Sequence, residues 1–136
     1  MKVKLDDGAF IPKRAHDADA GYDLFATESK TVPAHGSAVF DTGVHMEIPY
    51  GYAGVIKSKS GLNIKHDILS DGLVDSGYTG SVRVKLYNHG DSDYEVLRGD
   101  KISQIMVVPV YLPSISIVTE LEETERSDGG FGSTGR

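Results

Sequence analysis

The sequence predicts an all-β fold, a distorted β-barrel or jelly-roll sandwich with at most one short helix. The first reason is the spacing of glycine, because 16 glycines among 136 residues leave only short segments between them, as in sandwiches and barrels. The second reason is the alternation over residues 81–86, where Val82, Val84 and Leu86 are separated by charged residues. This period of two is typical of a strand with one buried face.

Further segments fit the same fold. In the segment 37–48, the last apolar residues, Val44, Met46 and Ile48, alternate with polar residues. The run 102–110 is almost continuously apolar, so we expect it to be buried on both faces. The predicted strands are 37–48, 52–56, 81–86, 94–97 and 102–110, and the one helical candidate is 62–67.

Pro109 and Pro113 interrupt the last strongly apolar region. Proline is confined to strand edges, strand ends and bulges, so the two prolines indicate a hinge, after which a β pattern resumes over 114–121. We therefore expect one core domain over residues 1–121, including this last strand, and a flexible Gly-rich tail over 122–136.

The tail has one large apolar side chain, Phe131, among several glycines. By itself it cannot bury enough surface to offset its ordering entropy. One explanation is a frayed terminus. The other is a ligand-binding segment, because glycine-rich backbone surrounds phosphate oxygens, arginine binds phosphate through two nitrogens and an aromatic ring stacks on a base.

Composition narrows the function classes. A formal net charge of −6 argues against a broad nucleic-acid-binding face. The sequence contains no run of about 18 apolar residues, so no membrane span is predicted. Residues 1–7 lack the apolar core of a signal peptide, so we expect a cytoplasmic protein. The absence of cysteine excludes a disulfide framework, a thiolate nucleophile and the zinc nucleobase deaminases. The five histidines have no metal-ligand spacing.

A glycine-rich turn over 72–80 carries Asp75 and Tyr78 directly before the strand 81–86. Its glycines permit a tight reversal, and loops held on rigid strands commonly carry function. Taken alone, the turn favours a structural explanation, in which Asp75 bonds its own backbone and Tyr78 packs beside it. A pair of functional side chains is the alternative.

Five segments in this order together resemble the trimeric deoxyuridine triphosphatases (dUTPases). The resemblance spans residues 20–135, and although each motif alone is weak, five in the family's order are specific. The matching segments are Ala20-Gly21-Tyr22-Asp23-Leu24, Lys59-Ser60-Gly61-Leu62, the turn 72–80, Gly99-Asp100-Lys101-Ile102-Ser103-Gln104, and Arg126 followed by Gly129-Gly130-Phe131-Gly132-Ser133-Thr134-Gly135.

The resemblance implies a dUTP diphosphatase, an enzyme that hydrolyses dUTP to dUMP and pyrophosphate by attack of water at the α-phosphorus. In the family's pattern Asp75 activates the water, and Asp23 holds a magnesium ion through a water molecule. Such an enzyme limits uracil incorporation into DNA and supplies dUMP for dTMP synthesis.

The resemblance also implies the substrate contacts. Tyr78 would lie under the deoxyribose, Phe131 over the uracil, and main-chain groups of the hairpin 69–83 would pair with the base. The α- and β-phosphate contacts would come from Ser60, Gly61 and Gln104, the γ-phosphate contacts from Arg126, Ser133 and Thr134, and further substrate contacts from Lys59, Leu73, Lys85 and Gly132.

The family is a homotrimer with three interfacial sites and a C-terminal strand exchanged between subunits, so we expect the same here. Three departures from the family's pattern affect this expectation: Lys59 and Lys101 stand where arginine is usual, Ser127 follows Arg126 where glycine is usual, and Gly77 and Thr79 replace commoner neighbours. Two alternatives remain open, a relative of the dCTP deaminases and a nucleotide-gated regulatory binding protein with a protein partner.

Overall fold

The computed structural model describes residues 1–127 and 129 of the chain, and within them it contains ten strands and one helix. Phe131, Gly132, Ser133 and Thr134, for which substrate contacts are predicted, lie outside the described residues. In chain order the elements are β1 (Val3–Leu5), β2 (Tyr22–Phe25), β3 (Lys30–Val32), β4 (Ser37–Met46), β5 (Tyr52–Lys57), α1 (Ser60–His66), β6 (Ile68–Leu69), β7 (Asp71–Val74), β8 (Ser81–Asn88), β9 (Tyr94–Val96) and β10 (Lys101–Pro109).

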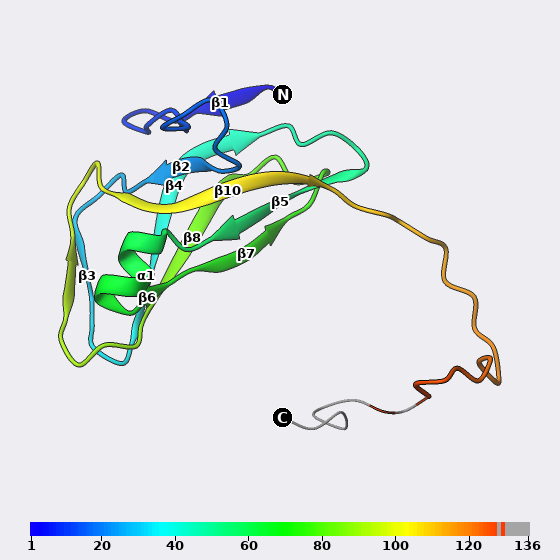
Figure 1. Cartoon of the computed structure of the whole chain (residues 1–136). Coiled ribbons are helices and arrows are strands. Elements are labelled where there is room, and N and C mark those ends of the chain that lie inside the picture. Colours follow the sequence, from blue (N-terminus) through cyan, green and yellow to red (C-terminus); the bar gives the residue numbers. More distant parts are fainter. Residues whose placement is uncertain (128, 130–136) are drawn as a thin grey trace.

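The strands form two four-stranded sheets, in the orders β1-β4-β8-β6 and β2-β10-β5-β7, and β3 pairs with β9 in a third, two-stranded sheet. All these pairings are antiparallel. Figure 1 shows the two larger sheets wrapped around a common interior, with α1 at one end. Side chains from both sheets, among them Phe40 and Leu86 of one and Leu24 and Ile105 of the other, form one hydrophobic core. The predicted all-β class with one short helix is confirmed.

The alternating segments behave as predicted. Val82, Val84 and Leu86 of β8 are buried, and the residues between them are exposed. Val44, Met46 and Ile48 are buried in the same way. In each case the apolar face of the strand meets the opposite sheet, which is the arrangement that a period of two allows.

The expectation that 102–110 is buried on both faces is wrong for its second half. Ile102 and Ile105 are buried, but residues 106–108 are only partly buried and Pro109 is exposed. The sheet register explains the difference. β2 pairs with β10 only as far as Ile105, whereas β5 continues to pair with it as far as Pro109, so the second half of β10 is a sheet edge.

The predicted helix 62–67 begins two residues earlier, at Ser60, and ends at His66. Lys59 before it is extended, and Asp67 after it has a left-handed φ of 53° with its amide donating to the carbonyl of Asn63. A left-handed residue at this position is a common way to end a helix.

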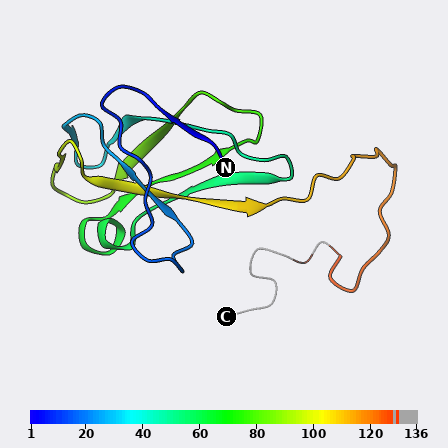
Figure 2. The same cartoon turned by 90° about the horizontal axis from the view of Figure 1, so that it is seen from above.

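The strand predicted over 114–121 does not form in the single chain. After β10 the amide of Val110 donates to the carbonyl of Gly51, and the chain then leaves the body (Figures 1 and 2). Ile115 and Ile117 are 92% and 97% exposed. A strand needs a neighbour for its amides and carbonyls, and none lies beside this segment within the described residues. Its exchange with another subunit stays a prediction.

Within residues 1–127 and 129, no helix has the length and apolar character needed to cross a membrane. The cytoplasmic location expected from the sequence stays a prediction.

Candidate active site

The turn between β7 and β8 carries Asp75 and Tyr78 as the sequence indicates. The main-chain carbonyl of Asp75 closes this turn by accepting a hydrogen bond of 3.0 Å from the amide of Tyr78. The Asp75 side chain therefore does not supply that hydrogen bond, and the residue is exposed. This favours the functional explanation of Asp75 over the structural one.

Tyr78 is held by the turn between β7 and β8. These two strands belong to different sheets and do not pair with each other, so the hairpin expected over 69–83 is instead a turn that crosses from one sheet to the other, and the name hairpin is kept for it below. Its hydroxyl donates to the carbonyl of Ser81 at 2.9 Å, and its ring lies against Gly80, where an added Cβ would be 2.6 Å from Cζ of the ring. Only glycine leaves room for the ring in this position. The hydroxyl end of the ring thereby lies against the turn, and about half of the surface of Tyr78 is exposed.

A pocket of about 430 Å³ opens between β7, the turn and the start of β8. It brings together three of the predicted site residues, Leu73, Asp75 and Tyr78. Leu73 is 67% exposed, so it presents an apolar surface at the rim. The remaining lining residues are Ile56, Gly72, Val74, Ser81, Val82 and Arg83.

A second group of predicted residues surrounds Asp23 on β2. The side chain of Asp23 is 7% exposed, and its carboxylate forms ion pairs with Lys59 and, at 2.8 Å, with Lys101. Burial acts to raise the pKa of Asp23, but the hydrogen bonds from Lys101 and Lys59 and the attraction of their charges outweigh it and hold the pKa below its ordinary value. The two lysines thus pair with the carboxylate, although each ammonium lacks the planar fork of arginine.

Gln104 on β10 is positioned by two backbone segments. Its side-chain amide donates to the carbonyl of Ser58 at 3.1 Å, and an added Cβ on Gly21 would lie 2.6 Å from its Oε1. Gly21 therefore allows β2 to approach the Gln104 side chain closely. The space that the Gln104 side chain needs is therefore a physical reason for glycine at position 21, in the motif 20–24.

Beneath Gln104 lies a chain of serine hydroxyls that sequence reasoning missed. Ser103 Oγ donates to the carbonyl of Lys57 at 2.9 Å and lies 2.8 Å from Ser70 Oγ. Ser58 Oγ donates to the carbonyl of Ser70 at 3.0 Å and accepts from its amide at 2.8 Å. Ser70 and Ser103 are buried. These contacts join the end of β5, just before Lys59, to β10 and to the segment between β6 and β7.

Ser60 and Gly61 begin α1 and are exposed. The first amides of a helix have no partner inside the helix, and no side chain caps this one. Together with Lys59 and Gln104, these residues give one polar area at the end of the sheet β2-β10-β5-β7.

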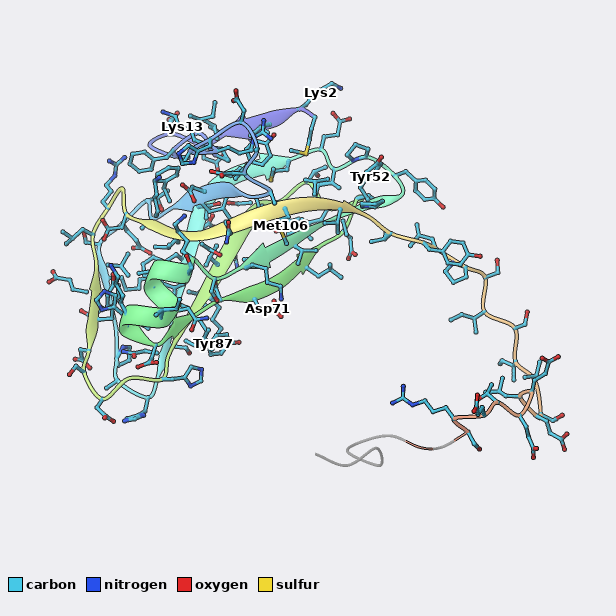
Figure 3. The ribbon with its side chains drawn as sticks, viewed as in Figure 1. Lys2, Lys13, Tyr52, Asp71, Tyr87 and Met106 are labelled. Atoms are coloured by element: carbon cyan, nitrogen blue, oxygen red, sulfur yellow. The ribbon has the colours of Figure 1, made fainter. Side chains whose placement is uncertain are left out.

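The register shows that this polar area and the Asp75 hairpin do not meet within one chain. Gln104 lies in the row of Lys57 and Asp71 across β10, β5 and β7, whereas Val74 lies in the row of Gly54. Three residues along the strands and two strand spacings across them separate Gln104 from Val74 by about 14 Å. Figure 3 labels Asp71 on β7 and Met106 on β10, between which β5 lies.

Two other predicted site residues lie elsewhere. Lys85 is exposed in the middle of β8, and its ammonium lies 4.9 Å from the ring centre of Tyr87, four residues along the strand from the hairpin. Arg126 donates through Nε to the carbonyl of Gly129 at 2.8 Å within the tail. The single chain brings neither side chain to the pocket.

Metal ligands are sparse. The described residues contain no group of three or more His, Cys, Asp or Glu side chains that could hold an ion. Mg²⁺ is usually bound by one or two carboxylates, retained waters and substrate phosphates. Asp23, whose two oxygens contact lysine ammonium groups, suits contact with an ion through water better than direct ligation.

Comparisons with known proteins give the same family as the motifs. The family model described as dUTPase matches residues 7–135. The chain is 43% identical over 139 residues to the deoxyuridine 5'-triphosphate nucleotidohydrolase of Clostridium acetobutylicum. This alignment covers 99% of this chain and 96% of that protein. It is 43% identical over 133 residues to the protein of the same name from Arabidopsis thaliana, covering 97% and 80%.

Solved structures agree in fold. The dUTPase of Staphylococcus bacteriophage 80alpha with dUPNHPP has a TM-score of 0.93 at 30% identity, covering 99% of this chain and 98% of that chain. A mutant dUTPase of phage phi11 of S. aureus, described as coordinating a structural Mg(II) ion, has a TM-score of 0.83 at 29% identity, covering 90% and 98%. The match over residues 7–135 and the identity along the whole length show that this chain belongs to the dUTPase family.

Proposed function

We propose that this chain hydrolyses dUTP to dUMP and pyrophosphate, with Asp75 activating the water that attacks the α-phosphorus. The observation that carries the assignment of Asp75 is its position. The residue lies at the rim of the Tyr78 pocket, in a turn that is closed by its main-chain carbonyl rather than by its carboxylate. General-base help of this kind is typically worth about 10²–10⁴-fold in rate.

The pocket selects the nucleoside in this proposal. The ring of Tyr78, placed against Gly80, packs under the deoxyribose and leaves no room for a 2′-hydroxyl. Leu73 packs at the rim of the pocket, and main-chain groups of the hairpin pair with the edge of uracil. A site built to hydrogen-bond one substrate edge rejects a wrong edge by about 10⁴–10⁵-fold, which suffices to exclude cytosine.

The polar area at the end of α1 binds the phosphates. Ser60 and Gly61 present a hydroxyl and a free helix amide, and Gln104 is held close by at the carbonyl of Ser58. Lys59 and Lys101 add positive charge around Asp23. Phosphoryl transfer depends chiefly on such positioning and charge.

The tail completes the site in this proposal. Arg126, Ser133 and Thr134 bind the γ-phosphate, Gly132 lets the backbone approach it, and Phe131 stacks on uracil, a contact worth about 1–3 kcal/mol. Lys85, for which the resemblance also implies a substrate contact, lies along β8 away from the pocket of its own chain, and its contact with the substrate stays a prediction.

The expected cofactor is Mg²⁺, supported by the family and by the phi11 relative. When bound, it neutralises charge on the phosphate oxygens. Asp23 would contact it through a water molecule. The lysines at Asp23 keep that carboxylate ionised, because they hold its pKa low, and they fix its orientation.

We further propose that the site is shared between subunits of a homotrimer. In one chain the backbone of Val74, next to Asp75, is about 14 Å from that of Gln104 by register, which is too far for Asp75 and Gln104 to act together on one α-phosphate. A second chain can supply the missing half. The exposed alternating segment around Ile115 and Ile117 then finds a strand partner on a neighbouring subunit, with the chain redirected between Pro109 and Pro113.

Product analysis tests the reaction. With Mg²⁺ present, we expect rapid pyrophosphate release from dUTP and little from dCTP, dTTP or UTP. Ammonia release from dCTP would instead identify a dCTP deaminase relative. Binding of dUTP without turnover would favour the nucleotide-gated binding protein.

Substitution tests the site. Asp75→Asn should lower kcat by about 10²–10⁴-fold while dUpNHpp binds with nearly unchanged affinity. Asp71→Asn is the matched control, because Asp71 lies on the same hairpin but pairs with Lys57. Near-normal turnover of Asp75→Asn would refute the assigned role. A chain ending before Arg126 should stay folded and lose most of its turnover.

A further inference from the structure

The turn that carries Tyr78 is tied to the N-terminal segment by one imidazole ring. His45 on β4 has its Nδ1 2.8 Å from the main-chain carbonyl of Thr79 and its Nε2 3.0 Å from Oδ2 of Asp6. Thr79 is the residue directly after Tyr78, and Asp6 follows β1. The ring therefore bridges two segments that are far apart in the chain, and one of them carries the proposed nucleoside pocket.

The position of His45 follows from β4. This strand lies between β1 and β8, and His45 is opposite Lys4 on one side and Ser81 on the other. Its neighbours Val44 and Met46 face the core, so its side chain is on the outer face, where it is 20% exposed. The pairing of β4 with β8 shifts register between Asp41 and His45, at the base of the hairpin.

Both partners of the ring are hydrogen-bond acceptors. A main-chain carbonyl can only accept, and an ionised carboxylate can only accept. A neutral imidazole has one N–H, so it can satisfy one of the two partners, whereas the imidazolium donates to both. Both ring nitrogens of His45 face hydrogen-bond acceptors, so only the protonated ring can donate to both of them.

The charged surroundings agree. The hydrogen bond to Asp6, and then that to the Thr79 carbonyl, raise the pKa of His45 above its ordinary value, although burial and the charge of Lys4 act against this. The hydrogen bond with His45 lowers the pKa of Asp6 in turn. The other charged groups nearby are Lys2 and Glu47, which pair with each other at 3.0 Å, and Asp41 and Arg83 at 3.5 Å at the hairpin base.

We propose that His45 is a positioning residue for the nucleoside pocket: as the imidazolium it holds the turn at Thr79 against the N-terminal segment, and loss of its proton releases the turn. The proposal rests on the proposed function of the Tyr78 hairpin. Its consequence is that substrate affinity in this chain depends on the protonation of a residue that does not touch the substrate.

The test compares the affinity of the full-length protein for dUpNHpp with Mg²⁺ between pH 6 and pH 8.5. In the unsubstituted protein the affinity should fall about three- to tenfold as His45 loses its proton, the size of one net hydrogen bond. The ionisation of the nucleotide itself contributes equally in every variant, so the difference between variants isolates His45.

Two variants separate the bridge from general packing. In Asp6→Asn a neutral ring can donate from Nδ1 to Thr79 and accept at Nε2 from the asparagine amide, so the tight affinity should persist across the whole pH range. In His45→Gln only one donor group reaches either partner, so the affinity should be weak and independent of pH. His35→Asn is the control, since His35 pairs with Asp91 at 2.9 Å on another surface, and it should keep the original pH profile.

Nuclear magnetic resonance gives a second readout without nucleotide. The protection factors of the Thr79 and Gly80 amides, which are their exchange rates corrected for the intrinsic rise with pH, should fall above the pKa of His45, and in Asp6→Asn they should not. The proposal is overturned if His45→Gln keeps the original affinity and pH profile, or if Asp6→Asn keeps the pH dependence. If instead Tyr78→Ala leaves dUpNHpp affinity unchanged, the hairpin is not the nucleoside pocket, while amide exchange still tests the bridge.

Discussion

The ring of Tyr78 rests on the backbone of Gly80, so closely that a Cβ at position 80 would be 2.6 Å from its Cζ. The hydroxyl of the same ring donates to the carbonyl of Ser81. Two residues of one turn therefore decide where the proposed sugar-binding surface lies. Glycine at position 80 is therefore required by the close approach of the Tyr78 ring, and not by a left-handed backbone conformation.

Gly80→Ala should displace Tyr78 and lower kcat/KM for dUTP by about 10–100-fold, as misplacement of a substrate-positioning group does. Discrimination against UTP should fall with it, because the ring no longer excludes a 2′-hydroxyl. Gly77→Ala is the matched control, since nothing lies within 4 Å of a Cβ there; its kcat/KM should change by about twofold or less. Steady-state kinetics with dUTP and with UTP measures both values of kcat/KM. Equal effects of the two substitutions would contradict the steric explanation.

Lys101→Met should lower the free energy of unfolding by about 1–2 kcal/mol, because it removes one of two cationic partners from the buried Asp23 carboxylate. Lys57→Met removes a similar ion pair in which both side chains are largely exposed, and it should cost about 0.5 kcal/mol or less. Urea unfolding followed by circular dichroism gives both values. The reverse order would show that the Asp23 pair does not stabilise the fold.

Acid should remove the stability that Asp23 contributes. The pKa of Asp23 is lower in the folded chain than its ordinary value, so its contribution is fully present above about pH 4 and is lost as the pH falls through the folded pKa. The difference in urea midpoint between the unsubstituted chain and Asp23→Asn should therefore narrow as the pH falls below about 4. If the difference in urea midpoint stayed constant as the pH fell, the stability contributed by Asp23 would not come from its ion pairs with the two lysines.

Replacing Ile115 and Ile117 together by Asp should convert the proposed trimer into single chains and abolish turnover. Side chains two residues apart lie on the same face of a strand, so both would face the same neighbour, and burying two carboxylates there is costly. Ser116→Asp is the control, because residue 116 lies on the opposite face. Analytical ultracentrifugation reports the mass. A monomeric unsubstituted protein would refute the shared site itself.

The long strands were predictable from the sequence because each carries enough residues to display its period. β8 and β4 have one face of Val, Leu and Met against the core, and the hydrophobic effect alone selects this face. Most of the short elements escaped prediction, the exception being β9, which was expected within 94–97. β1, β3 and β6 have three residues or fewer, too few for alternation to be recognised. β1 and β6 pair with the longer strands β4 and β8, and β3 pairs with β9.

The site divides in a similar way. Local sequence determined the Asp75–Tyr78 turn and the residue types of all five motifs, since glycine spacing and strand periodicity act over a few neighbours. Only the tertiary structure decided that Lys59 and Lys101 meet on Asp23, that Gly21 admits Gln104, and that His45 reaches Thr79. These contacts depend on which strands pair and in which register, and that choice is made by the packing of the whole core rather than by any one segment.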